Sequence, residues 1–123
     1  MRTGLIVALL ATTLAVSPTP SPDPALLARA KTAFAGLEQG RVDRSALTAS
    51  VNAEYNDAML EQSRSYFGPL GPPVEWEQVK YGMEDGGRYA GYVMTFADGK
   101  KFVLLFGIDG HGKIDVMTFF PFS

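Results

Sequence analysis

The sequence predicts an α+β domain in which N-terminal helices pack on a curved, four-stranded antiparallel β-meander. Two observations predict this class. Apolar side chains recur with helical spacing between residues 24 and 67. From residue 74 onward, four strand-like runs (74–83, 88–96, 101–108 and 113–120) are separated by short segments rich in Gly and Asp. Because short turns join antiparallel neighbours, we expect the runs to pair in chain order.

The first 23 residues predict two segments outside this domain. Arg2 and the apolar run over residues 5–16 have the layout of a secretory signal peptide, with cleavage after Ala15. The alternatives are an uncleaved anchor or a buried N-terminal helix. Residues 17–24 alternate Pro with small polar residues, which favours an extended spacer. We therefore expect a signal peptide over 1–15, a Pro-rich spacer over 16–23 and one domain over 24–123, secreted or periplasmic.

Composition narrows the partners that this domain can have. Loss of Arg2 with the leader leaves 10 basic against 13 acidic residues, and no basic cluster exists in the chain. Nucleic acid, which needs a basic surface, is therefore not an expected partner. The chain has no cysteine, so neither disulfides nor a thiol-linked lipid anchor can form. We expect a core without covalent cross-links, and no membrane span once the leader is removed.

Three helices are expected before the sheet. The first covers residues 24–39, because Asp23 suits an N-cap, Pro24 the first helical position and Gly40 a C-terminal stop. A short second helix follows Asp43, which is again an N-cap candidate. The third covers residues 51–67 and ends at Gly68-Pro69, since Pro cannot continue a helix.

Alternation along the strands assigns side chains to two faces of the sheet. The face expected to cover the helices carries Ala90, Tyr92, Met94 and Phe96, then Phe102, Leu104, Phe106 and Ile108, then Ile114, Val116, Thr118 and Phe120. The opposite, outer face is also partly apolar, which a fully solvated face would not be. Asp98-Gly99 between the second and third runs predicts a two-residue type I′ hairpin turn.

Three segments of the chain suggest a family resemblance. Residues 34–48 (FAGLEQGRVDRSALT), 67–71 (FGPLG) and 112–114 (GKI) are similar to small exported bacterial domains of the cystatin-like superfold, which includes the NTF2-like domains. The resemblance covers about residues 25–120. It implies an accessory or ligand-holding domain and brings no catalytic residues with it. The Ser-x-x-Lys and Gly-x-Ser-x-Gly signatures of secreted hydrolases are absent from the sequence.

The resemblance also implies a cone-shaped pocket between helices and sheet. The candidate lining residues are Tyr55, Met59, Tyr92 and Phe106. In related folds such a cone holds small apolar ligands or an acid–base pair. A small isomerase or hydrolase is therefore the enzymatic alternative, with Asp57 or Asp115 as its carboxylate. A less favoured alternative is a cystatin-type protease inhibitor, because residues 78–82 (QVKYG) loosely resemble the inhibitory wedge of that class.

The outer face of the sheet is the candidate interface. Its expected apolar residues are Val93, Val103, Leu105, Met117 and Phe119, and neighbouring strands would join them into one patch. His111, the one histidine, lies in a predicted turn and has no partners for a metal site. We therefore expect an exported, non-enzymatic binding or interaction module without cofactor or metal, accessory to cell-envelope or secreted proteins. Its partner would be a second copy or another exported protein.

Overall fold

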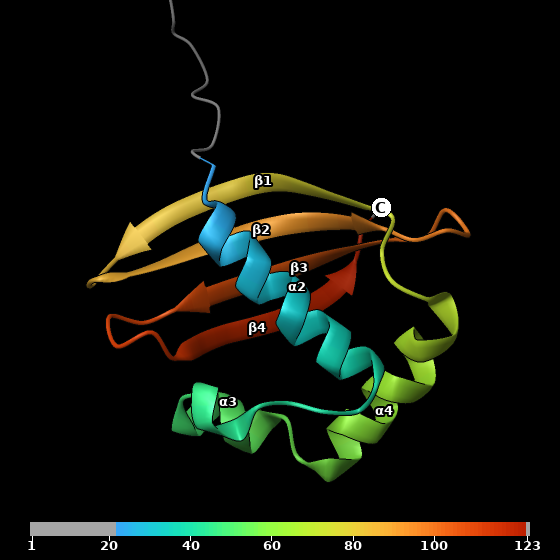
Figure 1. Cartoon of the computed structure of the whole chain (residues 1–123), viewed down its shortest axis with the longest axis horizontal. Coiled ribbons are helices and arrows are strands. Elements are labelled where there is room, and N and C mark those ends of the chain that lie inside the picture. Colours follow the sequence, from blue (N-terminus) through green and yellow to red (C-terminus); the bar gives the residue numbers. More distant parts are fainter. Residues whose placement is uncertain (1–21, 123) are drawn as a thin grey trace, which may run out of the picture.

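A computed structural model describes residues 22–122, so the predicted signal peptide and the spacer up to residue 21 lie outside the described residues. The helices α2 (Pro24–Glu38), α3 (Ala49–Glu54) and α4 (Asp57–Phe67) precede the strands β1 (Glu75–Glu84), β2 (Gly87–Thr95), β3 (Lys101–Ile108) and β4 (Ile114–Pro121). Two single-turn helices, η2 (Arg44–Ala46) and η3 (Gly68–Leu70), lie between them. The strands pair antiparallel in the order β1-β2-β3-β4, which confirms the predicted α+β meander (Figure 1).

The helix boundaries follow side-chain caps. Asp23 caps α2, as predicted, by accepting a hydrogen bond from the Leu26 N–H at 3.0 Å. The single helix predicted over residues 51–67 is wrong, because the chain forms two helices there. Asn56 caps α4 by accepting from the Met59 N–H at 2.9 Å. Tyr55 leaves the helical conformation just before this cap, with ψ at 58°, and so ends α3.

The turns correct one prediction. Asp98-Gly99 does not form a type I′ turn, because Asp98 keeps a negative φ and only Gly99 is left-handed, with φ at 90°. The Phe96 and Lys100 backbones pair across it, so the loop has three residues. The two-residue turn with positive φ at both positions occurs instead at Asp85-Gly86, between β1 and β2.

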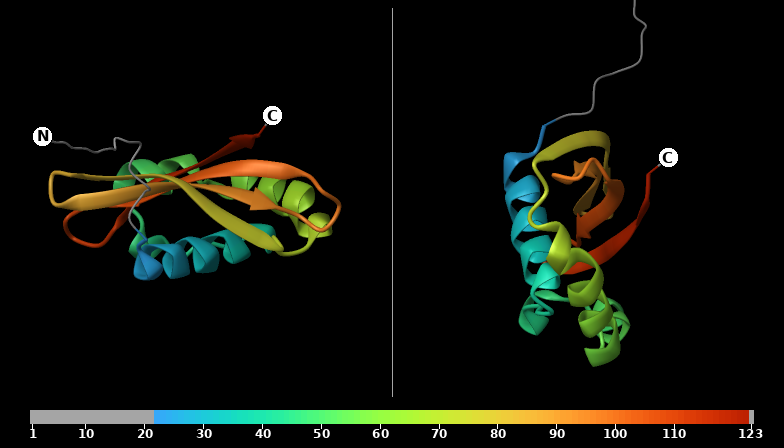
Figure 2. Two further views of the ribbon diagram at one scale, coloured as in Figure 1. Left: turned by 90° about the horizontal axis from the view of Figure 1, so that it is seen from above. Right: turned by 90° about the vertical axis from the view of Figure 1, so that its right-hand side faces the viewer.

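The core lies between α2 and the inner face of the sheet (Figure 2). α2 crosses the strands on this face, while α3 and α4 lie beside β4 and close the end of the layer (Figures 1 and 2). Within residues 22–122 no helix covers the opposite, outer face. The side chains buried completely in α2 are Leu26, Ala30, Phe34 and Leu37, which is the apolar stripe that the sequence predicts.

An aromatic cluster fills the core where α4 meets the strands. Phe67 is its centre and is 2% exposed. Its ring lies 5.1 Å from that of Phe34, 5.2 Å from that of Phe102 and 4.9 Å from that of Phe119, all edge-on. Edge-to-face contacts at this spacing are favourable, so the cluster holds α2, α4, β3 and β4 in one packed unit.

Candidate functional site

The predicted cone is filled by its own side chains. Tyr55, Tyr92 and Phe106 are at most 1% exposed and belong to the core, and Met59 is half-buried against it. None of the four lines either of the two cavities described below. The Tyr55 hydroxyl donates a hydrogen bond to the Met117 carbonyl on β4, so this side chain fastens α3 to the sheet. These residues therefore act as core in the structure.

A partly buried polar group lies where β1 and β2 meet the start of α2. The Asp23 carboxylate accepts from the Tyr81 hydroxyl at 3.0 Å and from Arg88 Nε at 2.6 Å, besides capping α2. Burial opposes ionisation of Asp23, but the hydrogen bonds from Leu26, Tyr81 and Arg88 outweigh it and lower the pKa of Asp23. A carboxylate held ionised in this way is a weak proton acceptor, so the group serves to attach α2 to the hairpin.

The Tyr92 hydroxyl lies close to that group but forms no hydrogen bond with the described residues. Burial, and next the negative charge of Asp23, raise the pKa of Tyr92 to about 12. The hydroxyl therefore stays protonated at physiological pH. The two carboxylates considered for catalysis lie elsewhere, since both Asp57 and Asp115 are exposed to solvent.

Glu38 is a titratable residue that the sequence pattern missed. Helical periodicity predicts a solvated side chain, yet Glu38 is half-buried, and its Oε2 atom has no hydrogen-bond partner among residues 22–122. Burial raises its pKa from 4.5 to about 7. The residue lines a crevice of about 360 Å³, whose wall includes Trp76 and the preceding prolines of the helix-to-sheet crossing. No local signal could have identified it, because the wall comes from β1.

The outer face differs from the prediction along β4. Ile108 pairs with Ile114, but Gly107 pairs with Val116, so Asp115 is an extra residue that forms a β-bulge. Beyond the bulge, every side chain of β4 therefore lies on the face opposite to the predicted one. Met117, only 2% exposed, and Phe119 therefore lie on the inner side, where the prediction placed Val116, Thr118 and Phe120. The assignment of Met117 and Phe119 to the outer face is wrong for this reason.

The corrected outer face remains apolar over β3 and β4. Val103 pairs with Phe120, and Leu105 pairs with Thr118. Phe120 is 43% exposed and Val116 37% exposed, although both are apolar. We call the set Val93, Val103, Leu105, Val116 and Phe120 the outer patch.

Glycines on the outer face leave space for large neighbouring side chains. The Tyr89 side chain lies across Gly82 and beside Gly107, so a Cβ atom added at Gly82 would come within 2.4 Å of the Tyr89 hydroxyl oxygen. Leu105 covers Gly91 in the same way, because its Cδ2 atom lies 3.2 Å from an added Cβ atom there. Large side chains thus occupy the space that each glycine leaves.

The open edges of the sheet are less accessible than its outer face. On β4, the Thr48 N–H donates a hydrogen bond to the Ile114 carbonyl at 3.0 Å, and the Tyr55 hydroxyl donates one to the Met117 carbonyl. On β1, a register shift at Val79 interrupts the strand. Such covering and bulges hinder the addition of a further strand. A partner would therefore meet the face of the sheet more readily than either edge.

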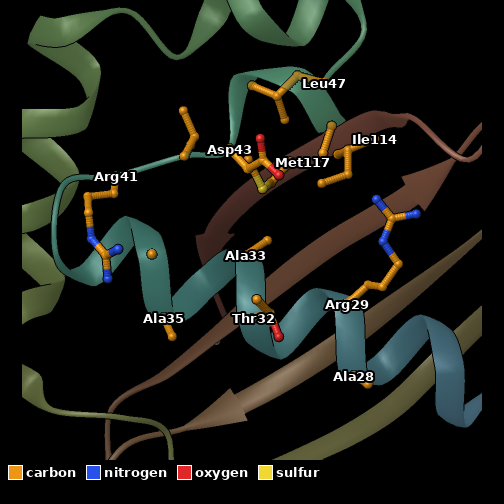
Figure 3. Close-up of a pocket in the computed structure, with 13 residues that line it drawn as sticks. Ala28, Arg29, Thr32, Ala33, Ala35, Arg41, Asp43, Leu47, Ile114 and Met117 are labelled. Carbon is orange, nitrogen blue, oxygen red and sulfur yellow. The ribbon is translucent and has the colours of Figure 1, made fainter.

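A separate groove of about 760 Å³ lies between α2, the segment 41–47 and the start of β4 (Figure 3). Most of its lining is apolar or small, with Leu47, Ile114 and Met117 on the side opposite α2. Arg29 and Arg41 stand toward its two ends. Sequence patterns did not predict it, because its walls come from segments about 70 residues apart in the chain.

Two classes of site are not found within the described part of the chain. Residues 22–122 contain no group of His, Cys, Asp or Glu side chains that could hold a metal ion. No helix among the same residues is long and apolar enough to cross a membrane.

Comparisons with known proteins leave the family of this chain open. No protein-family model matches the sequence, and searches of the curated proteins and of the solved structures found no match either.

Proposed function

We propose that this chain is an exported, non-enzymatic interaction module whose outer patch binds a protein partner, and that this partner is a second copy of the chain. The observation that carries the proposal is the corrected register of β4. It brings exposed Val116 and Phe120 onto the same face as Val103 and Leu105. Val93 and Val103 are only 4% and 9% exposed, so the accessible apolar surface comes from Val116, Phe120 and the partly exposed Leu105. Exposed apolar side chains that gather on one face of a folded domain are typical of a contact surface.

A second copy is the partner that the chemistry of the patch favours. The residues of the outer patch are aliphatic and aromatic, and exposed Thr118 lies among them between Val116 and Phe120. The surface is therefore mainly apolar and can pack against a copy of itself. Charged side chains border the patch on two sides. Glu77 on β1 pairs with Val93, and the Asp115 carboxylate lies beside Gly107, which pairs with Val116. A two-fold contact centred on Val103 and Phe120 would bury the apolar residues and keep these charges at its rim.

The binding role is favoured over the cone-pocket enzyme by the interior of the domain. Catalysis in a cone needs open space beside a carboxylate that can exchange a proton. The side chains of Tyr55, Tyr92 and Phe106 fill that interior, and Asp23 is held by three hydrogen-bond donors. The Tyr55 hydroxyl and the Asp23 carboxylate connect elements of the fold, and the Tyr92 hydroxyl has no hydrogen-bond partner among the described residues.

Export and an accessory role form part of the same proposal. The apolar run over residues 5–16 and the Pro-rich spacer support secretion, and the order of helices before a meander supports a cystatin-like or NTF2-like relationship. N-terminal sequencing of the protein recovered outside the cytoplasm tests the export. Cleavage after Ala15 would give a chain that begins at Val16, whereas retention of Met1 would contradict it.

Light scattering of the exported chain over a wide range of concentration tests the self-association. We expect the apparent mass to rise toward twice that of the chain. Val116→Lys should keep the protein monomeric, because a charge on the exposed part of the patch would be buried without a partner. Val74→Lys is the matched control, since Val74 is 67% exposed and lies outside the patch. A monomer at all concentrations, or equal effects of both substitutions, would contradict the proposal.

A further inference from the structure

We propose that the groove between α2 and β4 binds the anion of a long-chain alkyl carboxylate, with the alkyl chain along the groove and the carboxylate on Arg29. The groove is distinct from the outer patch, because Met117 lines the groove and points to the inner side of β4. The inference therefore stands whether or not the chain dimerises.

The groove has the size and surface of an alkyl-binding site. Its volume of about 760 Å³ lies within the range of small-molecule sites, and its lining is predominantly apolar. It follows α2 from Ala28 to Gly36, a distance of about 12 Å at the rise of an α-helix. A mainly apolar groove of this length suits a flexible, unbranched alkyl chain.

The nature of the walls favours an alkyl chain over an extended peptide. One wall is α2, whose backbone N–H and C=O groups bond within the helix and so cannot pair with a peptide backbone. On the opposite wall, the carbonyl of Ile114 already accepts from the Thr48 N–H. A peptide would lose hydrogen bonds to water there without replacing them, whereas an alkyl chain loses none.

Arg29 is placed to hold the head group. Its Nη1 atom donates to the Gly112 carbonyl at 2.7 Å, which fixes the guanidinium between α2 and the β3–β4 turn. A guanidinium has five N–H donors, so others remain for a carboxylate. Arg29 is half-buried, while Arg41 at the other end is exposed and bonds to the Gln39 side chain. Ion pairing is stronger where water is partly excluded, which favours Arg29.

The charge of the groove selects for an anion. Two arginines line it, and Asp43 is the acidic residue among its described lining. The Asp43 carboxylate is already engaged, since its Oδ1 atom accepts from the Ser45 N–H at 3.1 Å and from Ser45 Oγ at 2.6 Å. These donors are neutral, so Asp43 keeps its negative charge, and the described lining carries two positive charges against one negative charge. This balance favours an anion over a cation.

Titration calorimetry of the exported chain with dodecanoate tests the proposal, with dodecyltrimethylammonium as a probe of similar chain and opposite charge. We expect dodecanoate to bind about tenfold more tightly than the cation, as expected for one charge-assisted contact. Ala33→Phe should abolish binding, because the Ala33 side chain points into the groove. Arg29→Met should weaken binding about tenfold, and Arg29→Lys, which keeps the charge, should weaken it less.

Arg41→Met is the matched control for charge, and we expect less than about a threefold effect from this more exposed arginine. Thermal unfolding of each variant shows whether the fold is retained. In amide NMR spectra, addition of dodecanoate should shift the resonances of Leu47, Ile114 and Met117, which line the groove. Val116→Lys, on the outer face, should leave dodecanoate binding unchanged. Absence of binding, equal binding of the cation, or an Arg41→Met effect as large as that of Arg29→Met would overturn the proposal. Binding that survives Ala33→Phe would overturn it too.

Discussion

Glu38 makes the stability of this domain depend on pH in a direction opposite to that of an ion-paired carboxylate. Its pKa of about 7 in the folded chain lies above its ordinary value of 4.5, because burial penalises the charged form. The folded state therefore binds the proton more tightly than the unfolded state. Below about pH 4.5 Glu38 is protonated in both states and costs nothing. As pH rises toward 7 stability falls, and above 7 the full cost of the buried charge is present.

The size of this cost follows from the same two pKa values. The difference between 4.5 and about 7 corresponds to about 3 kcal/mol for a group removed completely from water. Glu38 is only half-buried, so solvent screening reduces the cost to about 1–2 kcal/mol. Glu38→Gln keeps the shape of the side chain and removes the charge. We expect it to stabilise the domain by that amount at pH 8 and to change little at pH 4.5.

Urea unfolding followed by circular dichroism at several pH values measures the effect. The difference between wild type and Glu38→Gln isolates this residue, because all other titratable groups are the same in both proteins. Glu77→Gln is the control, since Glu77 is an exposed carboxylate on the neighbouring strand. An exposed substitution should change stability by less than about 0.5 kcal/mol. A Glu38→Gln difference that is constant with pH, or a destabilised variant at pH 8, would refute the burial of this charge.

Four further substitutions test the packing, each by its free energy of unfolding. Met117→Ala should cost about 2–4 kcal/mol, whereas Val116→Ala should cost less than about 1 kcal/mol, and the reverse order would contradict the bulge at Asp115. Tyr55→Phe should cost about 1–2 kcal/mol because the buried Met117 carbonyl loses its donor, and an unchanged stability would show that this hydrogen bond is dispensable. Asp23→Ala should cost about 1–2 kcal/mol at pH 7 through loss of the cap and ion pair. Because the pKa of Asp23 is lowered in the folded state, Asp23 contributes fully to stability above pH 3.8, its ordinary pKa, and this contribution is lost at lower pH. A destabilisation by Asp23→Ala that stays the same in acid would contradict this role of the carboxylate.

The parts of the fold that sequence could predict are those determined by local patterns. Strand β3, with its alternating Phe102, Leu104 and Phe106, falls where the pattern placed it. Helix α2 likewise begins at its Asp23 cap and buries its predicted stripe. In both cases the spacing of the apolar side chains, together with a cap or turn residue at the boundary, is sufficient to define the element.

The parts that sequence reasoning missed have two different causes. The break between α3 and α4 had a signal in Asn56-Asp57, a cap followed by an acidic first turn, which the apolar stripe concealed. The bulge at Asp115 had no such signal, because both faces of β4 are apolar and either register satisfies the alternation. Because of this bulge, the outer face carries Val116 and Phe120, where the alternation predicted Met117 and Phe119.

The candidate sites depend on contacts between distant segments. The crevice that raises the pKa of Glu38 is completed by Trp76 on β1. The groove brings Arg29 on α2 beside the turn that precedes Ile114. Neither arrangement can be read from one segment, because each depends on how the chain folds back over α2.

Sedimentation equilibrium of the exported chain, compared with its Phe120→Lys variant, tests most directly whether the outer patch is the contact surface. Phe120 is 43% exposed, the largest exposed fraction in the patch, and pairs with Val103 on β3. We predict a reversible dimer for the wild type and a dissociation constant raised at least about tenfold by the substitution, because a lysine there would lose its hydration on association. A wild-type monomer, or a dimer that Phe120→Lys leaves unchanged, would contradict the proposed function.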